Sequence, residues 1–129
     1  MTFPTVEPNA ASEAFFAAAA RNALVLRRCE HCGRIRAPRR TTCRACGRRE
    51  ATWVEAAGTA ELVTWARHPG GRLFGMVELT EGPWLETALV GFEADRLKPG
   101  LPVAVRFVSG EGGAPYPVFG PAEQEEADA

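Results

Sequence analysis

A chain of 129 residues can hold one ordinary domain, or a small metal-stapled module followed by one compact domain. Its composition is globular, with 46% hydrophobic and 24% charged residues, and no apolar run is long enough to span a membrane. The formal net charge of −1 hides an asymmetry. Residues 21–50 carry ten of the fifteen basic groups against two glutamates, residues 51–120 carry five bases against eight acids, and residues 121–129 carry four acids. We therefore expect the basic and acidic segments to have different roles.

Alanine dominates from residue 9 to about residue 22, and this stretch is helical by composition. Asn9 or Ser12 can cap its start, and Phe15 and Phe16 recur with alanines at helical spacing to form one apolar patch. A helix this short is marginal alone and must dock somewhere. It lies either on its own protein or on a partner, and the residues leave both alternatives open.

Four cysteines form two Cys-x-x-Cys pairs, Cys29 with Cys32 and Cys43 with Cys46, and a glycine follows each pair. Each pair is typical of a tight turn that brings two sulfurs to one side, and two such turns can enclose one tetrahedral ion. Glycine suits the position after the second cysteine, where the backbone turns through positive φ. Because four thiolates leave no open coordination position, we expect one structural zinc ion and not a catalytic one.

The alternatives for these thiols are two disulfides, redox chemistry or an iron site. No secretory leader precedes the cysteines, and adjacent Cys-x-x-Cys pairs are poor staples for a whole domain, so a metal is favoured over disulfides. The lack of a leader also predicts a cytoplasmic protein. His31 lies inside the first pair, and we expect it to be an exposed spacer.

The rest of the chain reads as short strands. Three of them flank the cysteine pairs, at residues 24–26, 35–38 and 53–55, which is typical of a rubredoxin-like ribbon. Five alternating segments follow, at residues 60–68, 72–79, 84–90, 103–108 and 116–119, with turn residues between most of them. A polar stretch with a helical tendency comes after the third. The alternation alone also fits an SH3-like barrel, but this connection after Gly91 favours an OB-type barrel.

The expected fold class is therefore mainly β, with an N-terminal helix, a rubredoxin-like zinc ribbon and a five-stranded OB-type barrel. We divide the chain into an N-terminal extension and helix (1–23), the ribbon (24–56), the OB barrel (57–121) and an acidic disordered tail (122–129).

One face of the second barrel segment carries Phe74 and Met76, which alternate with inward residues, and Trp84 follows in the next segment. If the register were shifted by one, all three would instead belong to the core. Because glutamates lie among these residues, such a face repels a phosphate backbone. It can instead serve as an apolar protein interface. The candidates for a partner interface are Phe15, Phe16, Phe74, Met76 and Trp84.

No catalytic constellation is visible. The two histidines, His31 and His68, have no catalytic neighbours in sequence, and Ser109 lies in a glycine-rich loop without a base. No Walker-type or Rossmann-type glycine pattern is present. We therefore do not expect an enzyme that acts alone.

The arginines are more numerous than two negative charges of a Zn(Cys)4 centre require. Their planar guanidinium groups suit phosphates and carboxylates, so nucleic acid, a nucleotide-like cofactor such as coenzyme A, or an acidic protein face could bind them. A zinc ribbon joined to an OB barrel is familiar in nucleic-acid binding. The acidic barrel segment argues against that reading, because strand-binding OB faces are basic.

The order and spacing of these pieces resemble the acyl-CoA-associated OB-fold proteins with an N-terminal rubredoxin-like zinc ribbon, the domain of unknown function thirty-five family. The resemblance covers Phe15 to Pro121. It rests on the Phe-Phe helix before Leu24-Val25-Leu26-Arg27-Arg28-Cys29, on the two cysteine pairs with Pro38-Arg39 between them, on Glu81-Gly82-Pro83 leading to Leu89-Val90-Gly91, and on Leu97-Lys98-Pro99-Gly100-Leu101-Pro102-Val103. One departure is Thr42 before the second pair, where such proteins often place proline.

The resemblance implies an accessory subunit without catalytic residues. It would bind a thiolase-superfamily enzyme as a heterotetramer or larger assembly and help to form its acyl-CoA site. Such partners include acyl-CoA thiolases and thiolase-like aldolases that act on sterol side chains, and other members are fused to enoyl-CoA hydratases. On this view, the candidates for the CoA phosphates are Arg34, Arg36, Arg39 and Arg40. A nucleic-acid-binding ribbon–OB module is the alternative, and a structural adaptor without a ligand is the third hypothesis.

Overall fold

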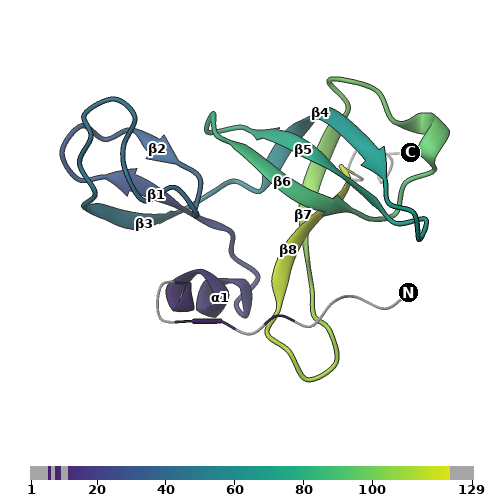
Figure 1. Cartoon of the computed structure of the whole chain (residues 1–129), viewed down its shortest axis with the longest axis horizontal. Helices are drawn as coiled ribbons and strands as arrows, with labels where there is room; N and C mark the ends of the chain where they lie inside the picture. Colours follow the sequence, from purple (N-terminus) through teal and green to yellow (C-terminus); the bar gives the residue numbers. More distant parts are fainter. Residues whose placement is uncertain (1–5, 7, 10–11, 123–129) are drawn as a thin grey trace.

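A three-stranded sheet and a closed five-stranded barrel make up most of the chain in the computed structural model (Figure 1). The structure describes residues 6, 8–9 and 12–122, so the acidic tail and most of the lead-in lie outside the described residues. The elements in chain order are α1 (Glu13–Ala19), β1 (Val25–Cys29), β2 (Ile35–Arg36), β3 (Ala51–Glu55), β4 (Thr59–Arg67), β5 (Leu73–Leu79), β6 (Trp84–Leu89), the 3-10 turn η1 (Ala94–Arg96), β7 (Pro102–Val108) and β8 (Tyr116–Pro121). None of the helices in this described part is long and apolar enough to cross a membrane.

The strand orders confirm the expected fold class. The ribbon sheet has the order β2-β1-β3, and the barrel has the order β4-β5-β6-β8-β7. Neighbouring barrel strands run antiparallel except for β6 and β8, which are joined by one parallel pair, Leu89 with Phe119. This closure, with η1 between β6 and β7, is that of an OB barrel and not of an SH3-like barrel.

Helix α1 is shorter than the predicted stretch of residues 9–22. Ser12 is its N-cap residue, but its hydroxyl accepts the Asn9 N–H (3.0 Å) instead of an N–H of the helix. At the other end, Asn22 has φ 63°, and the Ala23 N–H reaches the Ala18 carbonyl (2.9 Å). This Schellman-type ending turns the chain out of the helix and into β1.

Ribbon and barrel share a hydrophobic core. Its buried members are Leu24 and Leu26 from the ribbon side and Ala60, Leu62, Val77, Leu79, Leu89, Leu97, Val103 and Phe119 from the barrel side. A second, smaller cluster joins α1 to β1 through Ala18, Ala23 and Val25. The helix therefore packs on its own chain, which is the first of the two alternatives.

The register of β5 decides which side chains face outward. Val77 and Leu79 are buried in the core, whereas Phe74 and Met76 are half-buried and lie on the other face with the exposed Glu78. Gly75 faces inward, where a Cβ would collide with the Thr64 carbonyl oxygen. The predicted alternation is thus confirmed, and Phe74 and Met76 are not core residues.

Candidate metal centre and ribbon–barrel groove

The two cysteine pairs adopt the same backbone conformation. Gly33 and Gly47 both have φ 79°, and their N–H groups donate to the carbonyls of Cys29 (2.9 Å) and Cys43 (2.8 Å) respectively. The N–H of each of these first cysteines donates in turn to the carbonyl of the residue after the glycine. The positive φ expected after each pair is therefore present, and it repeats one knuckle geometry twice.

The four sulfurs of these knuckles converge on one point. All lie within 4.8 Å of one another, with Cys29 and Cys46 3.6 Å apart and Cys32 and Cys43 3.5 Å apart. Sulfurs bound tetrahedrally to zinc at about 2.3 Å would lie about 3.8 Å apart, so the four thiols fit this ion. The distances exceed a disulfide bond by more than an ångström, and all four cysteines are free, which excludes the disulfide alternative in this structure.

The knuckle N–H groups favour thiolates. The Cys32 backbone N–H lowers the pKa of Cys29 to about 6 against the opposing effect of burial, and the Cys46 N–H lowers the pKa of Cys43. At Cys46 the Arg48 backbone N–H lowers the pKa, but burial and the neighbouring thiols together raise it to about 11. Four thiolates so close together repel one another. A divalent cation at the centre would offset this repulsion, because it stabilises all four thiolates.

A groove of about 1790 Å³ lies between the ribbon, α1 and the barrel, and we call it the ribbon–barrel groove. The ribbon wall is formed mainly by residues 33–41, and the helix wall includes Phe15 and Phe16. The barrel wall consists of Met76, residues 81–87 and residues 116–117. Eight of the nine candidate ligand-binding and interface residues predicted from sequence line this one feature; Phe74 does not.

The four candidate arginines divide into two kinds. Arg34, Arg39 and Arg40 are exposed on the ribbon wall. Arg36 is only 5% exposed, and its Nε and one terminal nitrogen donate to the carbonyls of Arg40 (2.7 Å) and Arg49 (2.9 Å). The expectation for Arg36 therefore needs correction, because its guanidinium holds the loop between the knuckles and is not open to a phosphate.

A further arginine lies deeper in the groove and was not singled out from sequence. Arg27 donates through Nε to the Pro38 carbonyl, 2.6 Å away, and its guanidinium lies 4.2 Å from the ring centroid of Trp53. Burial and the nearby Arg36 lower the pKa of Arg27. Phe15 packs on the same Trp53 ring, at 6.4 Å between centroids. Only the pairing of β1 with β3 places Arg27 opposite Trp53, so this cation–π stack could not be found from local sequence.

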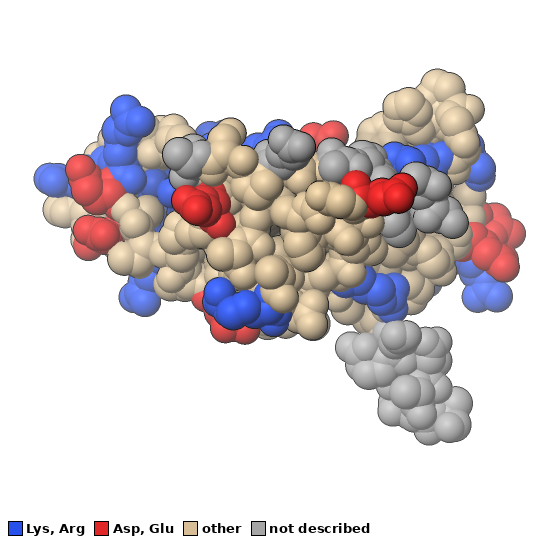
Figure 2. Space-filling model, turned by 90° about the horizontal axis from the view of Figure 1, so that it is seen from below, with Lys and Arg blue, Asp and Glu red and all other residues tan. Residues whose placement is uncertain are grey.

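The barrel wall of the groove is apolar at its rim. Trp84 is 54% exposed and is the only exposed large hydrophobic residue in the described part of the chain. It pairs across the strands with Glu78, and Met76 pairs with Glu86, so apolar and acidic side chains share this face. In the view of Figure 2, basic side chains at the ribbon end, on the left, have acidic side chains among them, and uncharged residues make up much of the middle of that face.

Glu81 joins the barrel wall to the segment between β3 and β4, which links the ribbon to the barrel. One carboxylate oxygen accepts the Ala57 N–H at 2.8 Å, and the other is buried without a hydrogen-bond partner among the described residues. This contact brings the β5–β6 turn against the segment between β3 and β4. Nothing in local sequence marked Glu81 as more than a turn residue, since its partner lies 24 positions away.

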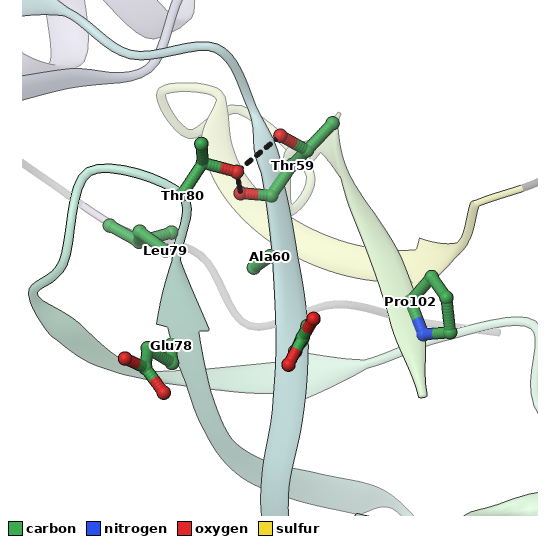
Figure 3. Close-up of a pocket in the computed structure, with 7 residues that line it drawn as sticks. Thr59, Ala60, Glu78, Leu79, Thr80 and Pro102 are labelled. Carbon is green, nitrogen blue, oxygen red and sulfur yellow. Dashed lines mark hydrogen bonds between the residues drawn. The ribbon is translucent and has the colours of Figure 1, made fainter. Parts of the chain in front are cut away.

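A smaller hollow of about 430 Å³ lies beside the start of β4, lined by Thr59, Glu78, Thr80 and Pro102 among others (Figure 3). The hydroxyls of Thr59 and Thr80 are 2.6 Å apart and bond to each other, and the Glu78 carboxylate lies away from them. Its hydroxyls are already satisfied, so this hollow shows no convergent set of groups for a ligand.

Two family profiles match this chain. Residues 16–51 match the ChsH2 rubredoxin-like zinc ribbon domain, and residues 53–108 match the ChsH2 C-terminal OB-fold domain. These two segments contain the whole metal centre and most of the barrel. The profile for the first segment independently supports zinc over iron as the ion of the four thiols.

Similar proteins point the same way. A chain of the Ltp2-ChsH2(DUF35) aldolase superimposes with a TM-score of 0.78 at 34% identity, over 93% of this chain and 99% of that one. A DUF35-family protein of unknown function from Sulfolobus solfataricus shares the fold, with a TM-score of 0.58 at 20% identity over 78% of this chain and 79% of that one. The probable enoyl-CoA hydratase alpha subunit of Thermomonospora curvata is 38% identical over 120 residues, which are 87% of this chain but 38% of that protein. This chain thus spans well under half of that relative's length.

Proposed function

This chain belongs to the ChsH2-type DUF35 family of zinc ribbon–OB proteins, and we propose that it is a non-catalytic accessory subunit of an acyl-CoA-processing enzyme. The partner we propose is a thiolase-fold enzyme, either a thiolase or a thiolase-like aldolase. The likeness to a chain of the Ltp2-ChsH2(DUF35) aldolase supports the aldolase most directly. Sterol side-chain acyl-CoA esters are the substrate class that we propose for such a partner.

One observation carries this proposal, namely the ribbon–barrel groove. It combines an arginine wall with an apolar wall, and the described residues that line it include no histidine and no thiol apart from the metal ligand Cys43. Such a surface can bind and orient a ligand or a partner, and its hydroxyls and carboxylates, such as those of Ser12 and Glu86, do not form a nucleophile–base pair among the hydrogen bonds of the described residues. Its function is therefore completed by another chain's active site.

The arginine wall suits the nucleotide end of coenzyme A. Arg34, Arg39 and Arg40 are exposed, and each can hold a phosphate through two parallel N–H···O bonds. Arg36 contributes indirectly, because its bonds to the Arg40 and Arg49 carbonyls set the path of the loop that presents them. A zinc ion held by the four thiols would support the same loop from its two ends.

The outer face of the barrel disfavours nucleic acid as the ligand. The exposed carboxylates of Glu61 and Glu78 lie directly opposite each other on β4 and β5, and Glu86 lies beside Met76 on β6. A single strand bound to an OB barrel instead needs a basic groove with stacking aromatics. An apolar and acidic face is better matched to a protein surface.

Co-purification tests the proposal directly. We expect the full chain, co-expressed with the Ltp2-like or thiolase-fold protein of the same genome, to elute as a stable hetero-oligomer containing one zinc per copy of this chain. A chain that stays monomeric beside every such protein, or that binds oligonucleotides tightly with a steep salt dependence, would contradict it.

Kinetics of the complex test the arginines. Replacing Arg39 and Arg40 together by Gln should raise the KM for acyl-CoA by about tenfold, since each charged hydrogen bond contributes about 1.5–3 kcal/mol when desolvated and less at an exposed site. The control pair is Arg48→Gln with Arg49→Gln, which removes equal charge from exposed side chains that do not line the groove. Equal KM values for the two double variants would leave Arg39 and Arg40 as surface charge.

A further inference from the structure

Strand β6 has a free edge on its β8 side. On its other side it pairs with β5 along its whole length, from Trp84 to Leu89. Toward β8 it makes a single pair, Leu89 with Phe119, supported by the Val90 N–H to Phe119 carbonyl bond of 2.9 Å. The barrel therefore closes at one end of β6 and is open along the rest of it.

The alternation of hydrogen bonds shows which backbone groups face this opening. The Leu79 N–H donates to the Pro83 carbonyl at 2.9 Å, so in the antiparallel ladder Leu85 and Thr87 face β5. Trp84 and Glu86 consequently direct both their N–H and C=O groups toward the β8 side. In the strand pairing of the described residues, neither Trp84 nor Glu86 is paired with β8, and one residue separates the two, as the strand period requires.

Strand β8 is poorly suited to satisfy these groups. The part of β8 that faces the opening begins with Tyr116 and Pro117, and both residues line the ribbon–barrel groove with Trp84 and Glu86. Proline has no N–H, so Pro117 offers only a carbonyl, and β8 is paired with β7 on its other side. The structure thus has an unpaired strand edge on one wall of a groove, opposite a strand with one donor missing.

The surroundings of this edge define what would fit it. The exposed side chains of the edge itself are Trp84, which is 54% exposed, and Glu86, and the half-buried Met76 lies one strand further away, on β5. Beyond Trp84 the β5–β6 turn meets the segment between β3 and β4 through Glu81 and Ala57, and the ribbon arginines line the same groove. An occupant should therefore be extended, apolar along β6 and acidic at its ribbon end.

We propose that the free edge of β6 binds an extended segment of the partner enzyme as an added strand, with a carboxylate of that segment on the ribbon arginines. This inference rests on the proposed function, because it names where the partner enzyme docks. Backbone bonds to Trp84 and Glu86 supply the register, and the exposed Trp84 side chain supplies the apolar contact.

Amide hydrogen exchange in the complex tests the inference. The probe is the full chain, alone and bound to the co-purified Ltp2-like or thiolase-fold enzyme, observed by NMR at single residues. We expect the Trp84 and Glu86 amides to exchange at least about tenfold more slowly in the complex, because a new backbone bond must open first. The Leu85 and Thr87 amides already bond to β5 and serve as internal controls. Unchanged exchange at Trp84 and Glu86 in a stable complex would overturn the added strand but leave the proposed function standing.

A proline variant removes one edge donor. Glu86→Pro deletes an N–H that β5 does not use, a position at which edge strands tolerate proline. Glu86→Ala is its matched partner, since it also loses the carboxylate but keeps the N–H. We expect Glu86→Pro to bind the enzyme about tenfold more weakly than Glu86→Ala, measured by calorimetry after zinc content and thermal unfolding confirm the fold. Equal affinities would contradict the inference. If Glu86→Pro does not fold, the exchange experiment decides alone, and if no complex forms with the unaltered chain, the proposed function fails as well.

Discussion

The ribbon and the barrel are built from similar short strands, but different forces hold them. The barrel side contributes eight of the ten buried residues of the main core, and the ribbon side contributes Leu24 and Leu26. In place of apolar burial, the ribbon has a cluster of four thiols and a buried arginine bonded to carbonyls. A segment with too little core to fold alone can present many exposed charges, because a metal centre replaces the missing hydrophobic stabilisation.

The division explains why binding features gather where the two parts meet. The four thiols and Arg36 hold the ribbon together and occupy little of its surface. The rest of that surface can therefore carry exposed arginines. In the described part of the chain, the exposed large hydrophobic side chain is Trp84, on the strand that makes a single pair with β8. The groove between them therefore has one basic wall and one apolar wall, which neither part has alone.

Removal of zinc should give the largest difference between the ribbon and the barrel. Chelation should cost the ribbon about 10 kcal/mol of metal-binding free energy, and Cys43→Ser a part of it, because the metal–thiolate bonds hold the two knuckles together. We expect amides of β1 and β3 to lose protection from exchange while those of β5 and β7 keep it. Simultaneous loss in both sheets would show that the shared core, and not the metal, decides the stability of the ribbon.

Truncating a core side chain on the ribbon side or on the barrel side tests whether the shared core makes the two parts unfold together. Leu26 on β1 and Leu62 on β4 are 0% and 1% exposed and belong to the same cluster. Leu26→Ala and Leu62→Ala should each lower the free energy of unfolding by about 2–5 kcal/mol, in one cooperative transition of the zinc-bound chain. Two separate transitions for Leu26→Ala in denaturant would contradict a single core.

The arginines of the ribbon should differ according to their burial. Arg36→Gln removes buried bonds to the Arg40 and Arg49 carbonyls, so we expect a loss of about 2–3 kcal/mol in the free energy of unfolding. Arg39→Gln removes an exposed charge and should change that free energy by less than about 0.5 kcal/mol. Equal losses, measured by urea unfolding of the two zinc-bound variants, would argue against a structural role for Arg36.

The smallest expected effect on stability is at the barrel rim. Trp84→Ala should alter the free energy of unfolding by less than about 0.5 kcal/mol, because more than half of the side chain is already in water. The same variant should weaken binding to the partner enzyme by at least about tenfold if Trp84 is an interface anchor. Ala66→Ser, also exposed on the barrel but outside the groove, is the control for binding.

Several features followed from local patterns. The cysteine pairs with their glycines predicted the knuckles and the tetrahedral thiol site, since each knuckle closes within five residues. The alternation in residues 72–79 predicted which side of β5 faces the core, and the connection after Gly91 favoured the OB barrel. Both were confirmed because burial of a strand face leaves a two-residue period in the chain itself.

Other features depended on long-range packing. Helix α1 ended earlier than its alanine-rich composition suggested, because Asn22 adopts a left-handed conformation and directs Ala23 into a buried site. Arg36 and Arg39 look alike in sequence, yet one is buried and the other exposed. That difference arises from carbonyls of residues up to 13 positions away, which no local pattern records.

By itself, the amino-acid order determined the ribbon ligands, the strand alternation and the charge separation, because each arises from neighbours within a few residues. Tertiary structure alone decided that the arginines and the aromatic residues line one groove, that Arg27 stacks on Trp53, and that β6 keeps a free edge. These features depend on how separate strands pair and on where the barrel closes, and both are set by the shared core of ribbon and barrel.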